Sequence, residues 1–189
     1  MLKNQADKNS VYDLIIIGGG SAAFSAAIQA SEFEKKVLMI NEGLPVGGTC
    51  VNVGCIPSKT LIRAAEQFHI SNYPGFSGID SGKNQIDFKK IIQQEKELVD
   101  ELRQAKYFDI IQGDTNVTFI KAFAKFIDTN TIEADGKKFT AENILIATGS
   151  TTFIPAIPGL EETGYLTNET LYELDELPEH LIVIGGRYI

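Results

Sequence analysis

The chain has 189 residues, of which 43% are hydrophobic, and a formal net charge of −8, a composition typical of a folded, soluble protein. The acidic balance, without a cluster of Lys and Arg, argues against nucleic acid and against an anionic membrane surface as partners. No apolar run approaches the roughly 20 residues that span a bilayer. The polar start (MLKNQADKNS) is unlike a signal peptide, so a cytoplasmic location is expected.

The N-terminal part of the chain predicts a β-α-β unit. Residues 12–17 (YDLIII) form a β-branched run between polar residues and glycines, a pattern typical of a buried parallel strand. After three glycines, residues 21–30 (SAAFSAAIQA) are rich in helix formers, and residues 37–40 (VLMI) fit a second strand. We therefore expect a parallel sheet with a crossover helix.

Helical periodicity returns after a segment rich in glycine and cysteine. Pro57 suits a first helical turn, and the apolar residues behind it predict a helix over residues 58–69. Residues 71–84 are rich in turn formers. From Phe88 to Leu102 the apolar spacing fits one long helix or two abutting helices, with a polar interruption at Glu95.

Short strands are expected in the next part of the chain. Residues 117–139 predict a small antiparallel meander with a hairpin turn at Asp135-Gly136. Residues 144–147 (ILIA) predict a further buried strand, and residues 151–160, with two prolines, fit an extended connection.

The end of the chain repeats its beginning. Residues 180–187 (HLIVIGGR) can be laid on residues 13–20 (DLIIIGGG), as if a second nucleotide-binding unit began there. The expected fold class is therefore α/β: a Rossmann-like domain with a parallel sheet, crossover helices and a small antiparallel meander. We expect this domain over residues 1–150, and the connection and first strand of a truncated second domain over residues 151–189.

The glycine-rich turn after the first strand is the first candidate binding site. Residues 18–23 (GGGSAA) match the GxGxxG/A pattern, in which glycines let the backbone approach a pyrophosphate at a helix N-terminus. A lone motif of this kind is as often an ordinary turn. Here a strand precedes it and a helix and a second strand follow it, which favours dinucleotide binding. The candidate residues are Gly18, Gly20, Ser21, Ala22 and Ala23.

The second strand is expected to end in a side chain that holds the ribose of the cofactor, about 20 residues beyond the glycines. Asn41 and Glu42 both fit, depending on whether positions are counted from the strand or back from Gly47. We favour Glu42, because a carboxylate can accept hydrogen bonds from both ribose hydroxyls. A solvated surface acid is the alternative.

Cys50 and Cys55 (CVNVGC) are the candidate reactive residues and the only two cysteines of the chain. A disulfide across so short a loop would contribute only about 2 kcal/mol to stability, which favours a redox role over a structural one. Cys55 lies close to an expected helix start, where the helix dipole favours a thiolate, and Lys59 adds a positive charge. Metal ligation is the weaker alternative, because two sulfurs without a histidine cluster do not make a closed zinc site.

The segment GGTCVNVGCIPSK, residues 47–59, resembles the redox-active disulfide motif of the FAD-dependent pyridine nucleotide-disulfide oxidoreductases. Residues 147–149 (ATG) resemble the stretch that closes the first part of the FAD domain in that family. Residues 18–28, 58–66 and 96–111 are most similar to the members that reduce mercury(II). The resemblance runs from Tyr12 to the end of the chain, but covers only the first part of a typical family member.

This resemblance implies FAD and, in the complete enzyme, NADPH as cofactors. FAD would lie along residues 18–23, with Gly48, Thr49, Thr148 and Gly149 as further contacts. Hydride would pass from NADPH to the flavin, and the electrons would then reduce a Cys50–Cys55 disulfide. Cys55 would stack against the flavin, Cys50 would meet the substrate, and Lys59 would stabilise the reduced flavin.

The implied substrate is Hg(II), held by Cys50 and Cys55. A small thiol or disulfide substrate, as in a dihydrolipoamide dehydrogenase, is the alternative, and so is a non-enzymatic FAD-binding module. Complete members of the family are homodimers. Arg187 stands where the family has the second glycine of its NADPH motif, so we expect weak NADPH binding there and no turnover by these residues alone.

Overall fold

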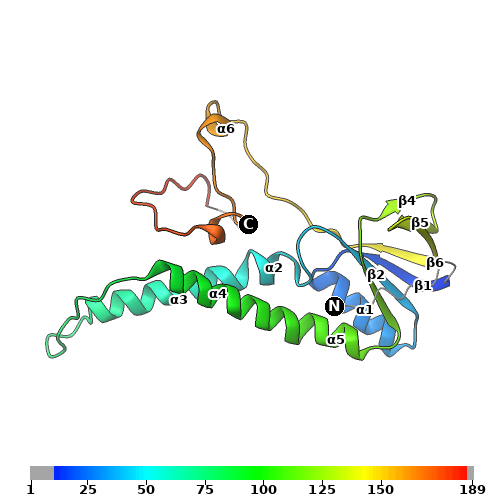
Figure 1. Cartoon of the computed structure of the whole chain (residues 1–189), viewed down its shortest axis with the longest axis horizontal. Coiled ribbons are helices and arrows are strands. Elements are labelled where there is room, and N and C mark those ends of the chain that lie inside the picture. The colour runs from blue at the N-terminus through cyan, green and yellow to red at the C-terminus, as the bar shows by residue number, and fades with distance from the viewer. Residues whose placement is uncertain (1–10, 187–189) are drawn as a thin grey trace. The chain divides into compact units, whose positions relative to one another are not determined.

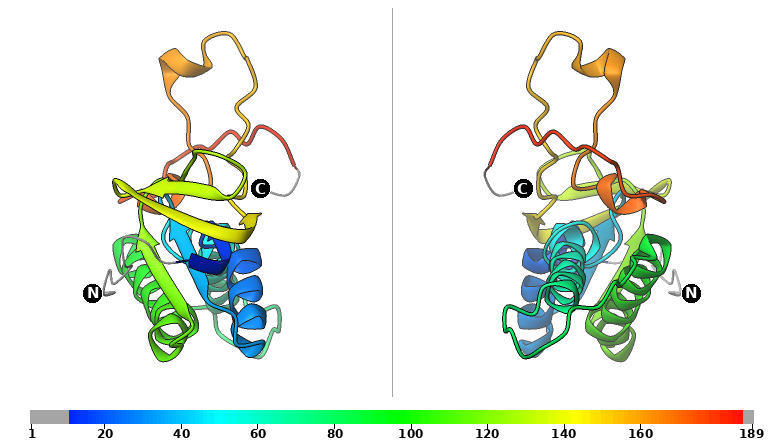
Figure 2. Two further views of the ribbon diagram at one scale, coloured as in Figure 1. Left: turned by 90° about the vertical axis from the view of Figure 1, so that its right-hand side faces the viewer. Right: turned by 90° about the vertical axis from the view of Figure 1, so that its left-hand side faces the viewer.

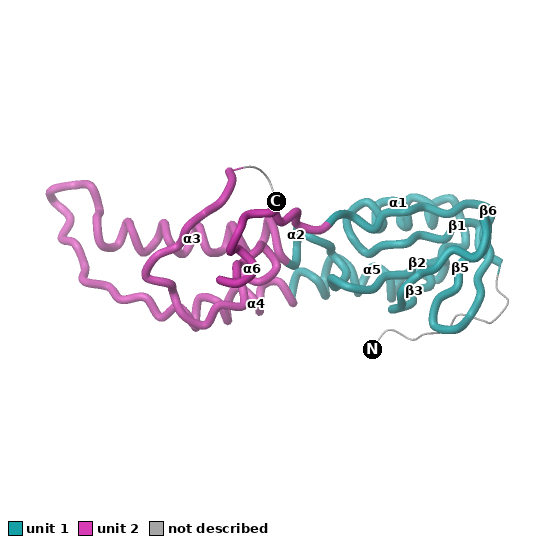
Figure 3. Tube along the Cα trace, turned by 90° about the horizontal axis from the view of Figure 1, so that it is seen from above, with its two compact units in different colours: residues 1–52, 101–150 teal, residues 53–100, 151–189 magenta. Residues whose placement is uncertain are grey.

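The structure is a computed structural model that describes residues 11–186 (Figure 1). Along the chain these residues form two units (Figure 3). Unit 1 consists of residues 11–52 and 101–150, and unit 2 of residues 53–100 and 151–186.

A six-stranded sheet with the order β3-β2-β1-β6-β5-β4 forms the centre of unit 1. Four neighbouring strands are parallel: β1 (Val11–Ile17), β2 (Val37–Asn41), β3 (Val117–Lys121) and β6 (Lys137–Ile146). The short strands β5 (Thr131–Ala134) and β4 (Lys125–Phe126) continue the sheet in antiparallel fashion. Helix α1 (Ser21–Glu32) connects β1 to β2, so the expected β-α-β unit and fold class are confirmed.

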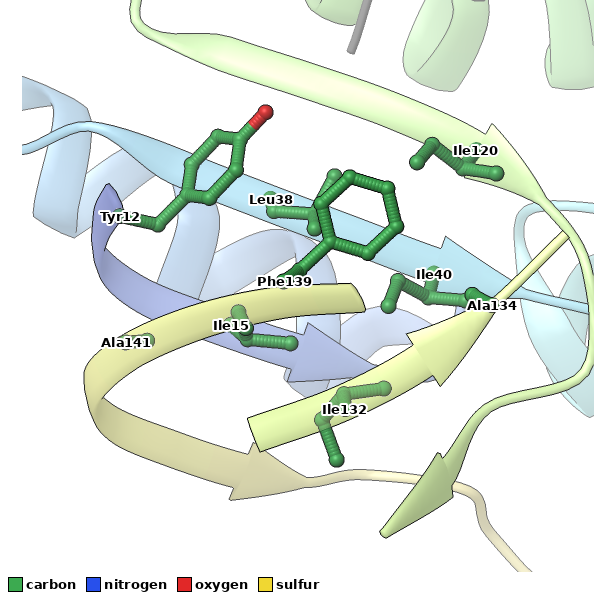
Figure 4. Close-up of a cluster of buried hydrophobic side chains, with 9 residues drawn as sticks. All are labelled: Tyr12, Ile15, Leu38, Ile40, Ile120, Ile132, Ala134, Phe139 and Ala141. Carbon is green, nitrogen blue, oxygen red and sulfur yellow. The ribbon is translucent and has the colours of Figure 1, made fainter. Parts of the chain in front are cut away.

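Both faces of the parallel part of this sheet are buried, because successive apolar side chains of a strand point to opposite faces. On one face Ile15, Leu38 and Ile40 pack with Phe139 beneath the curled hairpin strands (Figure 4). On the other face Ile16 and its neighbours pack against α1 and α5 (Asp109–Gly113), which lie on the same side of the sheet (Figure 2). Two-sided burial explains why the central strands β1 and β2 are nearly continuous apolar runs in the sequence.

The hairpin turn is found where the sequence predicts it, but two strand assignments were wrong. Asp135 and Gly136 both have positive φ, 51° and 66°, as a tight two-residue turn requires. β3 belongs to the parallel part of the sheet and not to the meander. Residues 137–139 and 144–147 were expected as separate strands, but residues 137–146 form the single strand β6, which ends before Ala147 and whose Ile146 is exposed. A long strand can serve both partners because its first half pairs with β5 and its second half continues along β1.

Unit 2 is built mainly from two long helices joined by residues 73–87. Helix α3 (Cys55–Asn72) begins three residues earlier than predicted, and α4 (Phe88–Arg103) matches the predicted second helix. The last three residues of α4, 101–103, belong to unit 1. After α4 the chain continues through a π-helical turn (Gln104–Phe108) into α5. The short helix α2 (Gly48–Asn52) precedes α3 and lies in unit 1.

Residues 151–186 contain only short elements, α6 (Leu160–Thr163) and a 3₁₀ turn (Leu171–Glu173). The strand expected from residue 180 onward is not formed over residues 180–186; the apolar side chains of residues 181–184 are exposed there. Arg187 lies outside the described residues. Among residues 11–186, no helix combines the length and apolar character needed to cross a membrane.

Candidate functional site

The turn after β1 can be built only with glycine at its first position. Gly18 has a φ of +134°, and a Cβ atom there would lie 2.1 Å from the carbonyl oxygen of Ala147. Its N–H donates to the carbonyl oxygen of Ile40 at 2.8 Å. The carboxyl ends of β1, β2 and β6 therefore meet at this turn, and Thr148 and Gly149 follow β6 at the same edge. This edge is where α/β sheets bind ligands.

The second glycine pair, Gly47-Gly48, lies against the first. The N–H of Gly47 donates to the carbonyl oxygen of Gly19 at 2.8 Å. A Cβ atom on Gly48, which has a φ of +59°, would lie 2.8 Å from the Cα atom of Gly20. The segment that leads to Cys50 therefore starts in contact with the glycine turn that follows β1.

The start of α1 fits a phosphate group. Gly20 is the N-cap residue and offers no side chain, and the first turn of the helix contains no acidic residue. A Cβ atom on Gly20 would meet only the Cα atom of Gly48, at an ordinary contact distance of 3.7 Å, so the fold itself leaves room beside Gly20. The N–H groups of a first helical turn have no partner within the helix and favour an anion. Ser21 and Ala22 are exposed, whereas Ala23 is buried where the helix meets the sheet.

Asn41 and Glu42 differ in what they contact. Asn41 is the last residue of β2, and a Cβ atom on Gly19 would lie 2.6 Å from its Cγ atom. The Asn41 amide donates to the carbonyl oxygen of Leu44 at 3.0 Å, and Asn41 lines a cavity of about 520 Å³ with residues 43–46 and Lys121. Glu42 is half-buried and is absent from the lining of that cavity. The structure thus brings Asn41 to the glycine turn, and the choice of Glu42 stays a prediction.

The two cysteines lie on two successive helices, α2 and α3. Thr49 and Cys50 belong to α2, where Thr49 is exposed and Cys50 half-buried. Cys55 is the first residue of α3 and is exposed. Lys59 follows it by one helical turn, so both side chains are on one face of α3. Lys59 lines a second cavity of about 520 Å³, between α3 and α4 within unit 2.

Two further residues at α2 were missed from the sequence. Asn52, the last residue of α2, donates its side-chain amide to the carbonyl oxygens of Pro45 and Gly48, and Arg103 donates to its side-chain oxygen. The position of Asn52 between the two cysteines could have drawn attention to it. Nothing in the sequence indicated Arg103, because it lies 51 residues away.

The fold and this site define a class of protein: a dinucleotide-binding α/β protein whose glycine turn contacts a segment that carries two cysteines. The model of the pyridine nucleotide-disulphide oxidoreductase family matches residues 12–189. The chain belongs to this family.

Relatives agree with this assignment. The chain is 50% identical over 178 residues to the mercuric reductase of Lysinibacillus sphaericus, covering 94% of this chain and 32% of that protein. It is 47% identical to the mercuric reductase of Bacillus cereus, covering 96% of this chain and 28% of that protein. Among solved structures, the HOCl-induced flavoprotein disulfide reductase RclA from Escherichia coli matches with a TM-score of 0.73 at 32% identity, over 88% of this chain and 35% of that chain. The chain thus spans about a third of the length of the relatives that it matches.

Proposed function

We propose that this chain supplies the FAD-binding part and the redox-active cysteine pair of an oxidoreductase that reduces Hg(II) at the expense of NADPH. The observation that carries the proposal is the contact between Gly48 and Gly20. This contact joins the start of the segment with the two cysteines, residues 47–59, to the glycine turn that follows β1. The identity of about 50% to a protein named mercuric reductase supports Hg(II) as the substrate.

The residues that would hold FAD surround the glycine turn. Gly20, Ser21 and Ala22 would lie beside the pyrophosphate, with Gly48 and Thr49 next to them and Thr148 and Gly149 at the neighbouring strand end. Gly18 and the buried Ala23 would shape the turn. Asn41 or Glu42 would hold the ribose. When bound, FAD supplies a carrier that accepts a hydride equivalent and passes on two electrons.

The cysteines and Lys59 have separate roles in this proposal. Reduction of a Cys50–Cys55 disulfide takes up two electrons and two protons and yields two thiols. Binding of Hg(II) by both sulfurs releases these two protons, and the soft thiolates suit this soft ion. Cys50 would meet the substrate, Cys55 would be the thiolate beside the cofactor, and Lys59 would place its positive charge near it.

We propose the same division of the chain as the sequence suggests, with residues 1–150 in the FAD-binding domain and residues 151–189 leading into a domain for NADPH. A cytoplasmic location and a homodimeric complete enzyme belong to the proposal. The second candidate function is reduction of a small disulfide substrate, which is favoured by the likeness to a flavoprotein disulfide reductase.

Hg(II) binding by the reduced chain tests the role of the cysteine pair. Because the chain has only two cysteines, each Cys→Ser variant leaves one thiol. We expect the unaltered chain to bind one Hg(II) through both sulfurs in competition with a monothiol. Cys50→Ser and Cys55→Ser should each bind it roughly 100-fold more weakly, because a second, tethered ligand acts at high effective concentration.

The measurement is the amount of Hg(II) retained after gel filtration from a glutathione buffer, with the double Cys→Ser variant as the baseline. Equal retention by the unaltered chain and by either single variant would contradict a shared Hg(II) site and favour the second candidate function.

A further inference from the structure

Asn52, which lies between the two cysteines, forms several side-chain hydrogen bonds. Its side-chain nitrogen lies 2.8 Å from the carbonyl oxygen of Gly48, 2.9 Å from that of Pro45 and 3.3 Å from that of Val46. All these groups are in unit 1. One amide therefore connects the end of α2 to the turn before it.

Arg103 determines which way this amide points. Its Nε atom donates to the side-chain oxygen of Asn52 at 2.9 Å. A guanidinium can only donate hydrogen bonds and the three carbonyl groups can only accept them, so the amide satisfies both sides in one orientation only. The Asn52 amide is thus bonded at its oxygen and at its nitrogen.

This arrangement is well placed to hold α2, which has only five residues. So short a helix has little stability of its own and depends on tertiary contacts for its direction. The turn that Asn52 closes contains Gly47 and Gly48, which contact Gly19 and Gly20. Cys50 lies on α2 between this turn and Asn52, so both ends of its helix are fixed through one side chain.

We propose that Asn52 is the positioning residue for Cys50, and that Arg103 acts through Asn52. This inference rests on the proposed function, in which Cys50 and Cys55 form a redox pair. Neither Asn52 nor Arg103 takes part in the chemistry. They fix the direction of α2 before the sulfur–sulfur bond forms, and so make the disulfide more favourable.

The test measures the thiol–disulfide equilibrium of the whole chain in buffers of reduced and oxidised glutathione. In this reaction two cysteine thiols lose two electrons and two protons, and one glutathione disulfide is reduced to two glutathione molecules. For Asn52→Ala we expect the equilibrium constant for the Cys50–Cys55 disulfide to fall about tenfold, which corresponds to about 1.4 kcal/mol. Far-UV circular dichroism checks that the variant is folded.

The matched control is Asn130→Ala. Asn130 also donates its side-chain amide to two backbone carbonyl groups, those of Ala141 and Glu142. Its partner Ala141 pairs with Tyr12 near the amino end of β1, whereas Cys50 follows the carboxyl end of β2. We expect Asn130→Ala to leave the equilibrium constant within about twofold of the original value.

Arg103→Met keeps the proposal testable if Asn52→Ala fails to fold. It removes the donor to the Asn52 oxygen, and we expect a fall of roughly threefold, smaller than that of Asn52→Ala. In a double-variant cycle, the effect of Arg103→Met should shrink when Asn52 is already alanine, because part of it acts through Asn52.

Three results would contradict the proposal or a part of it. Equal shifts for Asn52→Ala and Asn130→Ala, or no shift in a folded Asn52→Ala chain, would overturn the proposal for Asn52. An undiminished Arg103→Met effect in the Asn52→Ala background would overturn the coupling. If the unaltered chain forms no Cys50–Cys55 disulfide at any glutathione ratio, the proposed redox pair fails as well, which separates failure of the proposed function from failure of the inference.

Discussion

Glycines in one motif are required for different reasons, and the structure separates these reasons residue by residue. Gly18 is required by the folded chain itself, because a Cβ atom would collide with the carbonyl group of Ala147. Gly20 is not. Its φ of −90° suits any residue, and its Cβ atom would make an ordinary contact of 3.7 Å with Gly48. A glycine that the fold does not require points to a ligand that needs the space.

Gly20→Ala is therefore expected to weaken FAD binding while leaving the fold intact. The added methyl group would occupy the approach to the first N–H groups of α1, where we place the pyrophosphate. We expect the Kd for FAD, measured by titration of flavin fluorescence, to rise at least about tenfold, which is about 1.4 kcal/mol. The free energy of unfolding in urea should change by less than about 1 kcal/mol.

Two control variants make this prediction specific. Gly78→Ala adds a methyl group in open space and should change neither quantity. Gly18→Ala should destabilise the folded chain. An alanine at this positive φ is strained, and its Cβ atom would collide with the backbone carbonyl group of Ala147. If Gly20→Ala binds FAD as well as the unaltered chain, the pyrophosphate does not lie over this helix start.

At the scale of the element, α4 carries a charged residue on its apolar face. Glu95 lies on that face with Ile92 and Val99 and is only 2% exposed; it is the only buried charged residue among residues 11–186. Burial raises the pKa of Glu95, Lys96 lowers it in part, and the negative charges of Glu173 and Asp100 raise it further. Burial also raises the pKa of Tyr172, to which the charge of Glu95 contributes.

The raised pKa of Glu95 predicts a pH-dependent stability. A group that binds its proton more tightly in the folded chain stabilises it fully below the ordinary carboxyl value of 4.5, and this contribution is lost as the pH rises through the raised pKa. Glu95→Gln removes the titration. We expect the variant to match the unaltered chain near about pH 4 and to be more stable towards about pH 7.

Urea unfolding at a series of pH values and constant ionic strength checks this expectation. Glu97→Gln is the matched control, because Glu97 is exposed on the same helix and accepts a hydrogen bond from Gln93 of that helix. The difference in stability from the unaltered chain should change more with pH for Glu95→Gln than for Glu97→Gln, because Glu95 is buried and Glu97 is exposed. A flat difference for Glu95→Gln would contradict the assigned burial of its charge.

The elements that could be predicted are those encoded by local patterns. The runs of β1 and β2, the small residues of α1 and the Asp135-Gly136 turn each sit in a short stretch of sequence that specifies them. Glu95 was visible as an interruption of the helical period, but its burial depends on packing within unit 2. The continuity of β6 and the Asn52–Arg103 hydrogen bond arise from pairing between distant segments, which a local pattern does not contain.

At the scale of the whole molecule, the segments that resemble the family differ in how far the fold supports them. The glycine turn and the cysteine segment have defined contacts within unit 1, where Gly20 meets Gly48 and Asn52 meets Arg103. The end of the chain differs: Ile182 is 88% exposed and Val183 76% exposed, and residues 180–186 form no strand. A nucleotide-binding turn needs a strand to carry it, and a strand needs a hydrogen-bonded neighbour.

Residues 1–189 as a polypeptide are therefore expected to bind Hg(II) without turning it over. In the proposed function Cys50 and Cys55 supply the ligands, whereas residues 180–186, which resemble the start of an NADPH motif, form no strand, and Arg187 follows them at a glycine position. The measurement is NADPH absorbance with Hg(II), FAD and excess thiol present, with the mercuric reductase of Lysinibacillus sphaericus as the active control. Hg(II)-dependent NADPH loss at a rate comparable to that control would contradict the expectation. Such a result would mean that NADPH reaches the cysteine pair by a route other than the turn after residue 184.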